Sequence, residues 1–481
     1  MALHTSCAEI TSNSFIRGGI MNKIVCPGCN LGCGLYKNDV LYFRKNAPVN
    51  SGKLCRFGMK LHKYEKALPM VDGKEEKLPN AISAASKKLA ETKEFAFVSF
   101  GNVTCEEQLA FTKLASTVGS NVYTCIPGFV GANIEKIRQS TEIITFIDPY
   151  ATYPLILRHI LYAKENGAKI TSYYWKKIRI ADESVILNPA EIDKIKSIDF
   201  GDSLVILDLN PLNLEFSNEI INSCNRENIV CLKPFLNSTG ASLLSGEEKS
   251  IYQIFEEIKE KKIKGLYLLE SDPGIVPDDA LLSALDNLDV LIVQQSAHNS
   301  LSDRANIVLP NDRTFEGKGT VLNFEGRVLE TEGETEGIEV ISEILKSGGK
   351  EETSYDSLHA EVLSKLGITE IDEYVVPEYN IAYKPETELK KYEGKAHLIY
   401  VYTPFLWNNT IDRDFVEISP GLAESLNLHK DRLLEMTSSK GSAAVKYKIV
   451  ETVPDNIVLS PMKLPISTDV ITPVEFKPEQ N

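Results

Sequence analysis

The chain has 481 residues, of which 43% are hydrophobic and 25% charged, a composition typical of globular proteins with a large buried core. Its formal net charge of −15 argues against a nucleic-acid or anionic-membrane surface as the main binding partner. No apolar run reaches the roughly 18 residues that span a membrane, and residues 1–20 lack the apolar segment of a secretory signal. We therefore expect a cytoplasmic protein of several domains, whose periodic sequence begins at Met21.

Four cysteines near the start of this periodic sequence form the most specific pattern in the chain. Cys26, Cys29 and Cys33 have the spacing C-x2-C-x3-C, and Cys55 follows 22 residues later. Closely spaced loop cysteines, completed by one cysteine from a returning segment, are typical ligands of a [4Fe–4S] cluster. Four cysteines can also hold a structural zinc ion, but zinc sites usually pair two C-x2-C knuckles, and the second is missing here. The spacing therefore predicts a [4Fe–4S] cluster, with zinc as the alternative.

The periodicity predicts a small β-rich cluster domain over residues 21–62, followed by alternating strands and helices. Six short apolar runs are typical of buried strands: 94–100, 143–148, 203–209, 228–232, 265–270 and 290–294. Amphipathic segments lie between them, and this alternation predicts parallel sheets with helices on both faces and ligands at the carboxyl ends of the strands. We divide this part into two α/β domains, 63–200 and 201–345.

The pattern changes again in the C-terminal part of the chain. Residues 346–395 are charged and weakly periodic, which predicts a helix followed by an extended linker. Residues 396–470 contain five short β-rich runs and one short helix, 420–426. Strands at this spacing are typical of a small barrel.

In this order, the motifs resemble the molybdopterin oxidoreductase superfamily, which includes formate dehydrogenases, nitrate reductases and the large iron–sulfur subunit of respiratory complex I. The four cysteines, with the Pro48–Asn50 segment, Gly52 and Gly58, are similar to the family's N-terminal [4Fe–4S] domain. The segment 305–327 is similar to a further family stretch, and 416–441 looks like its double-psi barrel, which covers the dinucleotide cofactor. The resemblance covers nearly all of residues 22–465. It implies an α/β chain with a small β-rich cluster domain, doubly wound parallel domains and a C-terminal double-psi β-barrel.

The resemblance also implies roles for single residues. It assigns the four cysteines to the cluster and marks six residues as candidates near a molybdopterin guanine dinucleotide: Arg56, Asp148, Asn237, Gly240, Asp272 and Asn323. Many active members carry a lysine between cluster and pterin, where this chain has Phe57 with Arg56 as a candidate substitute. Asp148 replaces a family asparagine, and its carboxylate would repel a diphosphate.

Cys125 falls where active members of the family ligate molybdenum or tungsten. The histidine that follows this ligand in formate dehydrogenases is Ile126 here, so the proton-handling group beside the metal is missing. A free cysteine in an apolar loop is usually a buried small hydrophobe. The altered loop and the missing lysine argue against a bound dinucleotide with Mo or W.

We therefore expect a [4Fe–4S] electron-transfer subunit of a larger oxidoreductase complex, resembling the large iron–sulfur subunit of complex I. Its partners would be other redox subunits, with a ferredoxin-like or flavin/NADH-type electron donor. A place in the peripheral arm of a membrane complex, on the cytoplasmic face, is compatible with this hypothesis, and no nucleic acid is required. Two alternatives stay open. One is an active Mo/W bis-pterin oxidoreductase of the formate dehydrogenase type with Cys125 on the metal, and the other is a zinc-stapled scaffold without redox activity.

Overall fold

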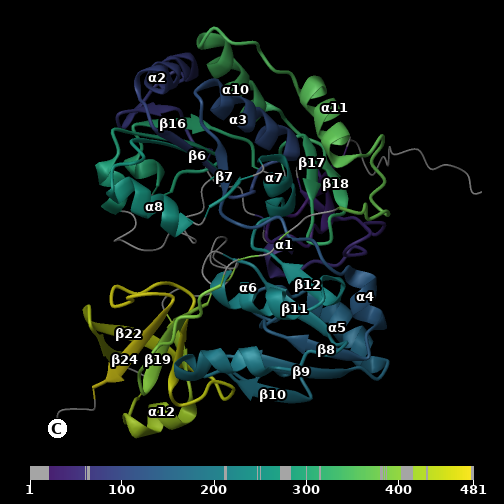
Figure 1. Ribbon diagram of the computed structural model, residues 1–481, viewed down its shortest axis with the longest axis vertical. Coiled ribbons are helices and arrows are strands. Elements are labelled where there is room, and N and C mark those ends of the chain that lie inside the picture. The colour runs from purple at the N-terminus through teal and green to yellow at the C-terminus, as the bar shows by residue number, and fades with distance from the viewer. Residues whose placement is uncertain are drawn as a thin grey trace, which may run out of the picture.

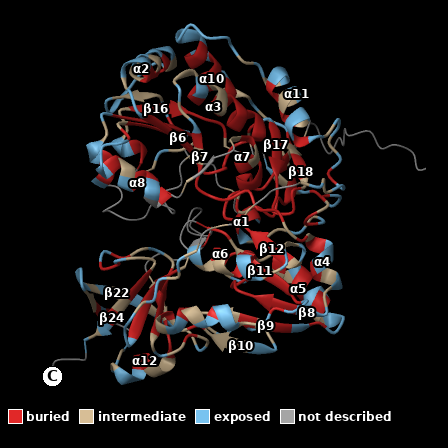
Figure 2. Ribbon diagram, viewed as in Figure 1, coloured by how far each residue is buried: buried red, intermediate tan, exposed pale blue. Residues whose placement is uncertain are grey.

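The computed structural model describes residues 21–38, 40–59, 61, 66–210, 214–245, 247–249, 251–270, 283–299, 301–313, 316–379, 383, 385, 387–401, 403, 415–429 and 432–477. The chain forms an upper and a lower group of elements in the view of Figure 1, with the short helix α1 (Arg56–Met59) between them. In Figure 2 the buried residues are concentrated in the sheets and on the inner sides of the helices. Among the described helices, none is long and apolar enough to cross a membrane.

The N-terminal part of the described chain contains a small three-stranded sheet. Its three strands pair in an antiparallel sheet in chain order: β1 (Asn22–Val25), β2 (Gly34–Lys37) and β3 (Leu41–Phe43). The loop between β1 and β2 carries three of the four clustered cysteines, and Cys55 immediately precedes α1. This sheet packs beside a separate hairpin, β17 (Gly319–Leu322) and β18 (Val328–Thr331).

The larger sheet lies in the upper part of Figure 1 and is parallel except at one edge. Its strands, in spatial order, are β13 (Glu247–Glu248), β7 (Val122–Thr124), β6 (Phe95–Ser99), β14 (Gly265–Leu269), β15 (Val290–Gln295), β16 (Ile307–Pro310), β4 (Met70–Val71) and β5 (Lys74–Glu75). Alternate side chains of β6 enter two different cores, Phe97 on one face and Val98 on the other. Because both faces are covered, these strands are continuously apolar.

Helices cover both faces of this sheet. One face packs against α2 (Leu78–Glu91), α3 (Cys105–Thr117), α10 (Glu336–Ser347) and α11 (Tyr355–Leu366). The other face packs against α8 (Ile251–Lys259). A further helix, α7 (Ser238–Ser245), lies against α3 and β17. Thr104 begins α3 with a capping box, in which the side chains of Thr104 and Glu107 each bond the other's backbone N–H.

The second sheet lies below and is parallel throughout. Its spatial order is β10 (Glu183–Ile186), β9 (Lys169–Tyr174), β8 (Glu142–Thr145), β11 (Leu204–Asp208) and β12 (Ile229–Leu232). The helices of this unit are α4 (Ile134–Gln139), α5 (Ile156–Glu165) and α6 (Leu214–Ser223). Four short 3₁₀ segments complete the α/β part: Pro189–Ser197, Arg226–Asn228, Leu285–Asn287 and Ser302–Arg304.

The boundary expected between residues 200 and 201 does not coincide with the boundary between the sheets. β11 and β12 belong with β8 to β10, whereas the larger sheet takes its strands from 70–124 and from 247–310. The second sheet is thus inserted between two parts of the first. Periodicity locates each strand, but parallel strands pair through long crossovers, so their neighbours are not encoded locally.

The C-terminal part is a closed six-stranded barrel. Its strands follow the order β19 (Ala396–Tyr400), β23 (Ile457–Ser460), β20 (Phe415–Ile418), β22 (Gly441–Ile449), β21 (Leu434–Ser438) and β24 (Ile471–Phe476), with α12 (Pro420–Ser425) beside them. The last strand, β24, begins after the expected end of this domain at residue 470. In the described part of the preceding segment, α11 is followed by an extended chain to residue 395.

Candidate iron–sulfur centre

The four clustered cysteines converge on one small cavity. Cys26 follows β1 and Cys33 precedes β2, and the Cys26 N–H donates to the Cys33 carbonyl over 2.8 Å. The cavity has a volume of about 20 Å³. Its walls consist of the four cysteines with Gly28, Leu31, Phe57, Thr152, Pro154 and Leu155. The last three come from the segment that leads into α5, so the second sheet's unit closes the site opened by the N-terminal domain.

The four cysteine residues differ in overall exposure. Cys26 and Cys33 are buried, whereas Cys29 and Cys55 are partly exposed. Burial, reinforced by the nearby Cys55, raises the pKa of Cys29 to about 12 and raises the pKa of Cys26 well above its usual value. Thiolates are therefore unfavourable in this cavity unless a bound cation offsets their charge, which iron would do.

The donor set fits a polynuclear cluster better than a single ion. Around a zinc ion, four sulfurs at about 2.3 Å from the metal must approach one another closely. Over the described residues, no three His, Cys, Asp or Glu side chains are arranged to hold one metal ion. The four cysteines line one shared cavity whose other walls are almost entirely apolar, and their spacing along the chain is typical of [4Fe–4S] ligands.

Long-range hydrogen bonds fix the loop that carries these cysteines. The Asn30 N–H donates to the Lys233 carbonyl (3.2 Å), and the Asn30 side-chain oxygen accepts from the Lys233 N–H (2.8 Å). The Phe324 N–H donates to the Asn30 carbonyl (2.8 Å), and the Asn323 amide donates to the Leu31 carbonyl (3.1 Å). Segments about 200 and 300 residues away therefore hold the loop in shape before any metal binds.

Gly32 and Gly28 are required in the same loop by close packing. Gly32 has φ +78°, and a Cβ there would lie 2.4 Å from Leu329 and 3.1 Å from Asn323. A Cβ on Gly28 would lie 2.4 Å from the ring of Phe57. Neither position accepts a side chain without displacing a neighbour, which at Gly28 is the cavity-lining Phe57.

Lys233 is a buried cation that the sequence analysis missed. It follows β12 and is 0% exposed, and its ammonium donates to the Phe129 carbonyl and to the Thr239 hydroxyl, each at 2.8 Å. Its backbone bonds the cysteine loop, so this residue links that loop to the segment after Cys125. The only local sign of its burial in the sequence is its position at the end of an apolar strand. This sign is weak because buried lysines are rare.

Phe57 and Arg56 separate in the structure. Phe57 is buried and lines the cavity, so the position of the family's bridging lysine is apolar here. Arg56 is exposed and does not line the cavity wall. Its bridging role stays a prediction.

Asn237, Gly240 and Asn323 are buried in internal contacts. The Asn237 amide donates to the Val103 carbonyl (2.8 Å), and its oxygen accepts from the Leu322 N–H (2.8 Å). A Cβ on Gly240 would lie 2.2 Å from that same oxygen. Asn323 bonds the cysteine loop and its own turn, where the Arg327 N–H donates to its oxygen (2.9 Å). These residues hold the protein's own backbone, and a dinucleotide-binding role for them stays a prediction.

Asp148 lies just beyond the end of β8 and is paired rather than isolated. Its carboxylate lies 3.1 Å from the Lys176 ammonium and accepts from the Tyr150 N–H (3.0 Å). Lys176 also binds Glu417 of the barrel at 2.8 Å. The repulsion expected from Asp148 is therefore partly neutralised inside the chain. Asp272, the remaining candidate, lies outside the described residues.

Cys125 lies directly after β7 and is 2% exposed. It packs in an apolar core with Phe100, Ile126 and Phe235. Burial raises the pKa of the Cys125 thiol far above its usual value. Its surroundings are those of a buried small hydrophobe, and a role as a Mo or W ligand stays a prediction.

A group of carboxyls at the carboxyl end of the larger sheet was also missed. Burial, reinforced by Asp312, raises the pKa of Glu107 to about 8. Burial likewise raises the pKa of Glu270 to about 8 and that of Asp312 to about 6. Glu107 comes from α3, and the other two follow β14 and β16, so only the fold brings them together.

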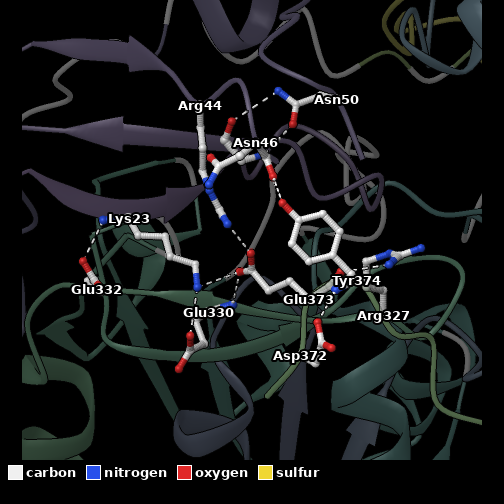
Figure 3. A network of polar contacts seen from close by, with 11 residues as sticks. Lys23, Arg44, Asn46, Asn50, Arg327, Glu330, Glu332, Asp372, Glu373 and Tyr374 are labelled. Atoms are coloured by element: carbon white, nitrogen blue, oxygen red, sulfur yellow. Dashed lines mark hydrogen bonds and ion pairs between the residues drawn. The ribbon is translucent and has the colours of Figure 1, made fainter. Parts of the chain in front are cut away.

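A second polar network, drawn in Figure 3, ties the N-terminal domain to the linker. Glu373, in the segment after α11, pairs with Arg44 and lies 2.9 Å from the Lys23 ammonium. It also accepts from the Glu330 N–H of β18 (3.1 Å), and its carbonyl accepts from Arg327 (2.8 Å). Tyr374 beside it donates to the Asn46 carbonyl. We call residues 372–375 the strap.

Comparison with known proteins agrees with this architecture. The family model for molybdopterin oxidoreductases matches residues 203–337, which include β11 to β18. This stretch is therefore similar to a molybdopterin oxidoreductase domain. The matched family is described as one of molybdopterin oxidoreductases.

Curated relatives match only parts of the chain. The alpha subunit of an F420-dependent formate dehydrogenase of Methanococcus maripaludis is 26% identical over 43% of this chain and 33% of its own length. The alpha subunit of an NADPH-Fe(3+) oxidoreductase of Geobacter sulfurreducens is 32% identical over 20% of this chain and 11% of its own length. A subunit of the NADH-quinone oxidoreductase of Pseudomonas fluorescens is 33% identical over 21% of this chain and 11% of its own length. The chain thus covers a third or less of each of these relatives.

Among solved structures, acetylene hydratase from Pelobacter acetylenicus has a similar fold. The TM-score is 0.60, with 91% of this chain and 92% of that chain covered at 12% sequence identity. At this identity the likeness concerns the fold, including the mixed α/β sheets and the closed barrel.

Proposed function

We propose that this chain is a cytoplasmic [4Fe–4S] electron-transfer subunit of a multi-subunit oxidoreductase. The observation that carries the proposal is the convergence of Cys26, Cys29, Cys33 and Cys55 on one apolar-walled cavity. A cluster bound there would supply one-electron transfer. Relatives named as subunits of formate dehydrogenase and NADH-quinone oxidoreductase support a role beside other redox subunits.

The chain's own residues would hold and shield the cluster. Four thiolates would ligate it, while the hydrogen bonds from Lys233 and Phe324 keep Asn30 and its loop fixed. Leu31, Phe57 and Leu155 exclude water from the cavity. A rigid, dry site lowers the reorganisation that accompanies a change in cluster charge, and it sets the reduction potential through burial.

We do not assign pterin chemistry to this chain. Asn237 and Asn323 bond internal backbone, Asp148 pairs with Lys176, and Cys125 lies in an apolar core. None of these side chains has its polar atoms reserved for a dinucleotide or a metal. An active formate dehydrogenase-like enzyme is the alternative that the relative from Methanococcus maripaludis favours.

Metal analysis of anaerobically purified protein tests the proposal. We expect about four Fe per chain, with no stoichiometric Mo, W or Zn, and visible absorption that disappears on reduction. Cys55→Ser should lose most of this iron, whereas the matched variant Cys125→Ser should keep it. Full iron in Cys55→Ser would refute the ligand assignment. One Mo or W per chain would establish the alternative enzyme, and a colourless zinc protein would establish a scaffold.

A further inference from the structure

The surroundings of the cysteine cavity have an unusual charge distribution. Three segments carry its lining residues: 26–34, 50–59 and 152–158. They contain no Asp or Glu, although the whole chain has 67 acidic and 52 basic residues. Their charged residues are Lys53, Arg56 and Arg158, and all three are exposed. The charged residues of these three segments are therefore all cationic, on a protein that is acidic as a whole.

Two of these cations are close in the chain to Cys55, one of the two partly exposed cysteines. Cys26 and Cys33 are buried, whereas Cys29 and Cys55 are partly exposed. Arg56 directly follows Cys55, and Lys53 precedes it by two residues. Met59, at the end of α1, is 58% exposed and adds an apolar side chain to the same surface. We call Lys53, Arg56, Met59 and Arg158 the basic rim.

Backbone contacts fix the basic rim relative to the cysteines. The Arg158 guanidinium donates to the Asn50 carbonyl over 3.2 Å. The Asn50 side chain donates to the Lys53 carbonyl (2.8 Å) and accepts from the Gly34 N–H (2.9 Å). The rim is thus tied to both segments that bring cysteines to the cavity.

We propose that the basic rim is the docking surface for an acidic one-electron carrier protein, which exchanges electrons at the Cys29–Cys55 edge. This inference rests on the proposed function. Complementary charge accelerates encounter between redox proteins, and transient electron-transfer interfaces are small, so a few cations around an exposed methionine suffice. In each exchange, the carrier loses one electron and the oxidised cluster gains it, or the reverse, and no bond forms or breaks.

A purely local role for these cations makes a different prediction. Positive charges beside an anionic cluster could act only by stabilising it, in which case their loss would change its potential or retention and leave partner encounter unaffected. Substitution of Lys53 distinguishes the local role from the docking role. Lys53 does not line the cavity wall, and its hydrogen bonds are made by its backbone and so survive substitution.

The test measures electron transfer between the anaerobic, cluster-containing full chain and an acidic two-iron ferredoxin by stopped flow. The methyl viologen radical cation serves as a small donor of opposite charge. We expect the ferredoxin rate to fall with ionic strength, and Lys53→Glu to lower it about three- to tenfold at low salt. The effect should vanish near about 0.5 M salt. Lys448→Glu, an exposed lysine on β22 of the barrel, is the matched control and should leave the rate unchanged.

Every outcome decides a separate point. The ferredoxin rate could be independent of both salt concentration and the Lys53→Glu substitution while the cluster absorption is intact. This result would overturn the docking surface and leave the proposed function standing. A chain that binds no iron overturns both. Equal losses with ferredoxin and methyl viologen, accompanied by a shifted cluster potential, would assign the cations to the cluster alone and also overturn the docking surface.

Discussion

Glu107 is the residue in which burial and helix capping conflict most clearly. It is 3% exposed, and one of its carboxylate oxygens accepts from the Thr104 N–H at 2.8 Å to close the capping box of α3. Its other oxygen has no hydrogen-bond partner and faces Gly337, where a Cβ would lie 2.4 Å away. A carboxylate at the capping position stabilises the helix, whereas the buried surroundings disfavour the negative charge of that carboxylate.

We predict that Glu107 makes the protein less stable as pH rises. Because its folded pKa of about 8 lies above the unfolded value, the unfolded chain releases the proton first, and stability falls between about pH 5 and pH 8. The slope contributed by one such group approaches about 1.4 kcal/mol per pH unit. Glu107→Gln, which imitates the protonated acid, should flatten this dependence and raise the melting temperature at about pH 8.

Glu75→Gln on β5 provides the control, because Glu75 is exposed. Its melting temperatures should follow those of the wild type at every pH. Equal destabilisation of Glu107→Gln at low and high pH would mean that the capping hydrogen bond, rather than the buried charge, dominates at this position.

The strap is the element that joins the linker to the cluster domain. Glu373 has a side chain only 5% exposed and faces two cations, Arg44 and Lys23. Burial alone would raise the pKa of Glu373, but these cations outweigh burial and hold it below its usual value. The carboxylate is therefore charged at neutral pH, and the same contacts fix β1 and β18 beside the cysteine loop.

We predict that Glu373→Gln loosens the cluster domain. The substitution leaves Arg44 and Lys23 partly buried without their shared anion, and breaking such a buried ion pair costs about 3–5 kcal/mol. Urea should therefore release the cluster at a lower concentration than in the wild type. The loss of the cluster's visible absorption measures this release. Glu370→Gln, three residues earlier and exposed, is the control. Identical midpoints for the two variants would mean that the strap does not support the cluster.

At the scale of the whole molecule, local patterns predicted the elements but not their partners. The cysteine spacing indicated a shared site, and the apolar runs indicated β6, β8, β11, β12, β14 and β15. The contacts that complete the site join residues far apart, such as Asn30 with Lys233 and Glu373 with Arg44. No sequence periodicity records such pairs, because they depend on how the sheets are interleaved. The same reason explains the misplaced boundary at residue 200.

Lys176 joins the second sheet's unit to the barrel. Its ammonium, on a side chain that is 13% exposed, lies 3.1 Å from Asp148 and 2.8 Å from Glu417 on β20. Burial opposes its charge, but the two carboxylates outweigh burial and raise the pKa of Lys176. Two further hydrogen bonds cross the same boundary, from Thr403 to the Ala151 carbonyl and from the Lys177 N–H to the Thr452 carbonyl.

We predict that Lys176→Met destabilises the chain more than Glu417→Gln does. Without the lysine, two carboxylates lose their shared cation, and Asp148 is buried. Without Glu417, whose side chain is 33% exposed, the Lys176–Asp148 pair survives. Thermal unfolding of the two variants and their double mutant should give a coupling energy of about 0.5–3 kcal/mol. If the destabilisations of the two single variants simply add in the double mutant, Lys176, Asp148 and Glu417 do not act as one ion-pair network. A coupling that persists in about 0.5 M salt would establish that the barrel and the second sheet form one docked unit, because buried ion pairs are poorly screened.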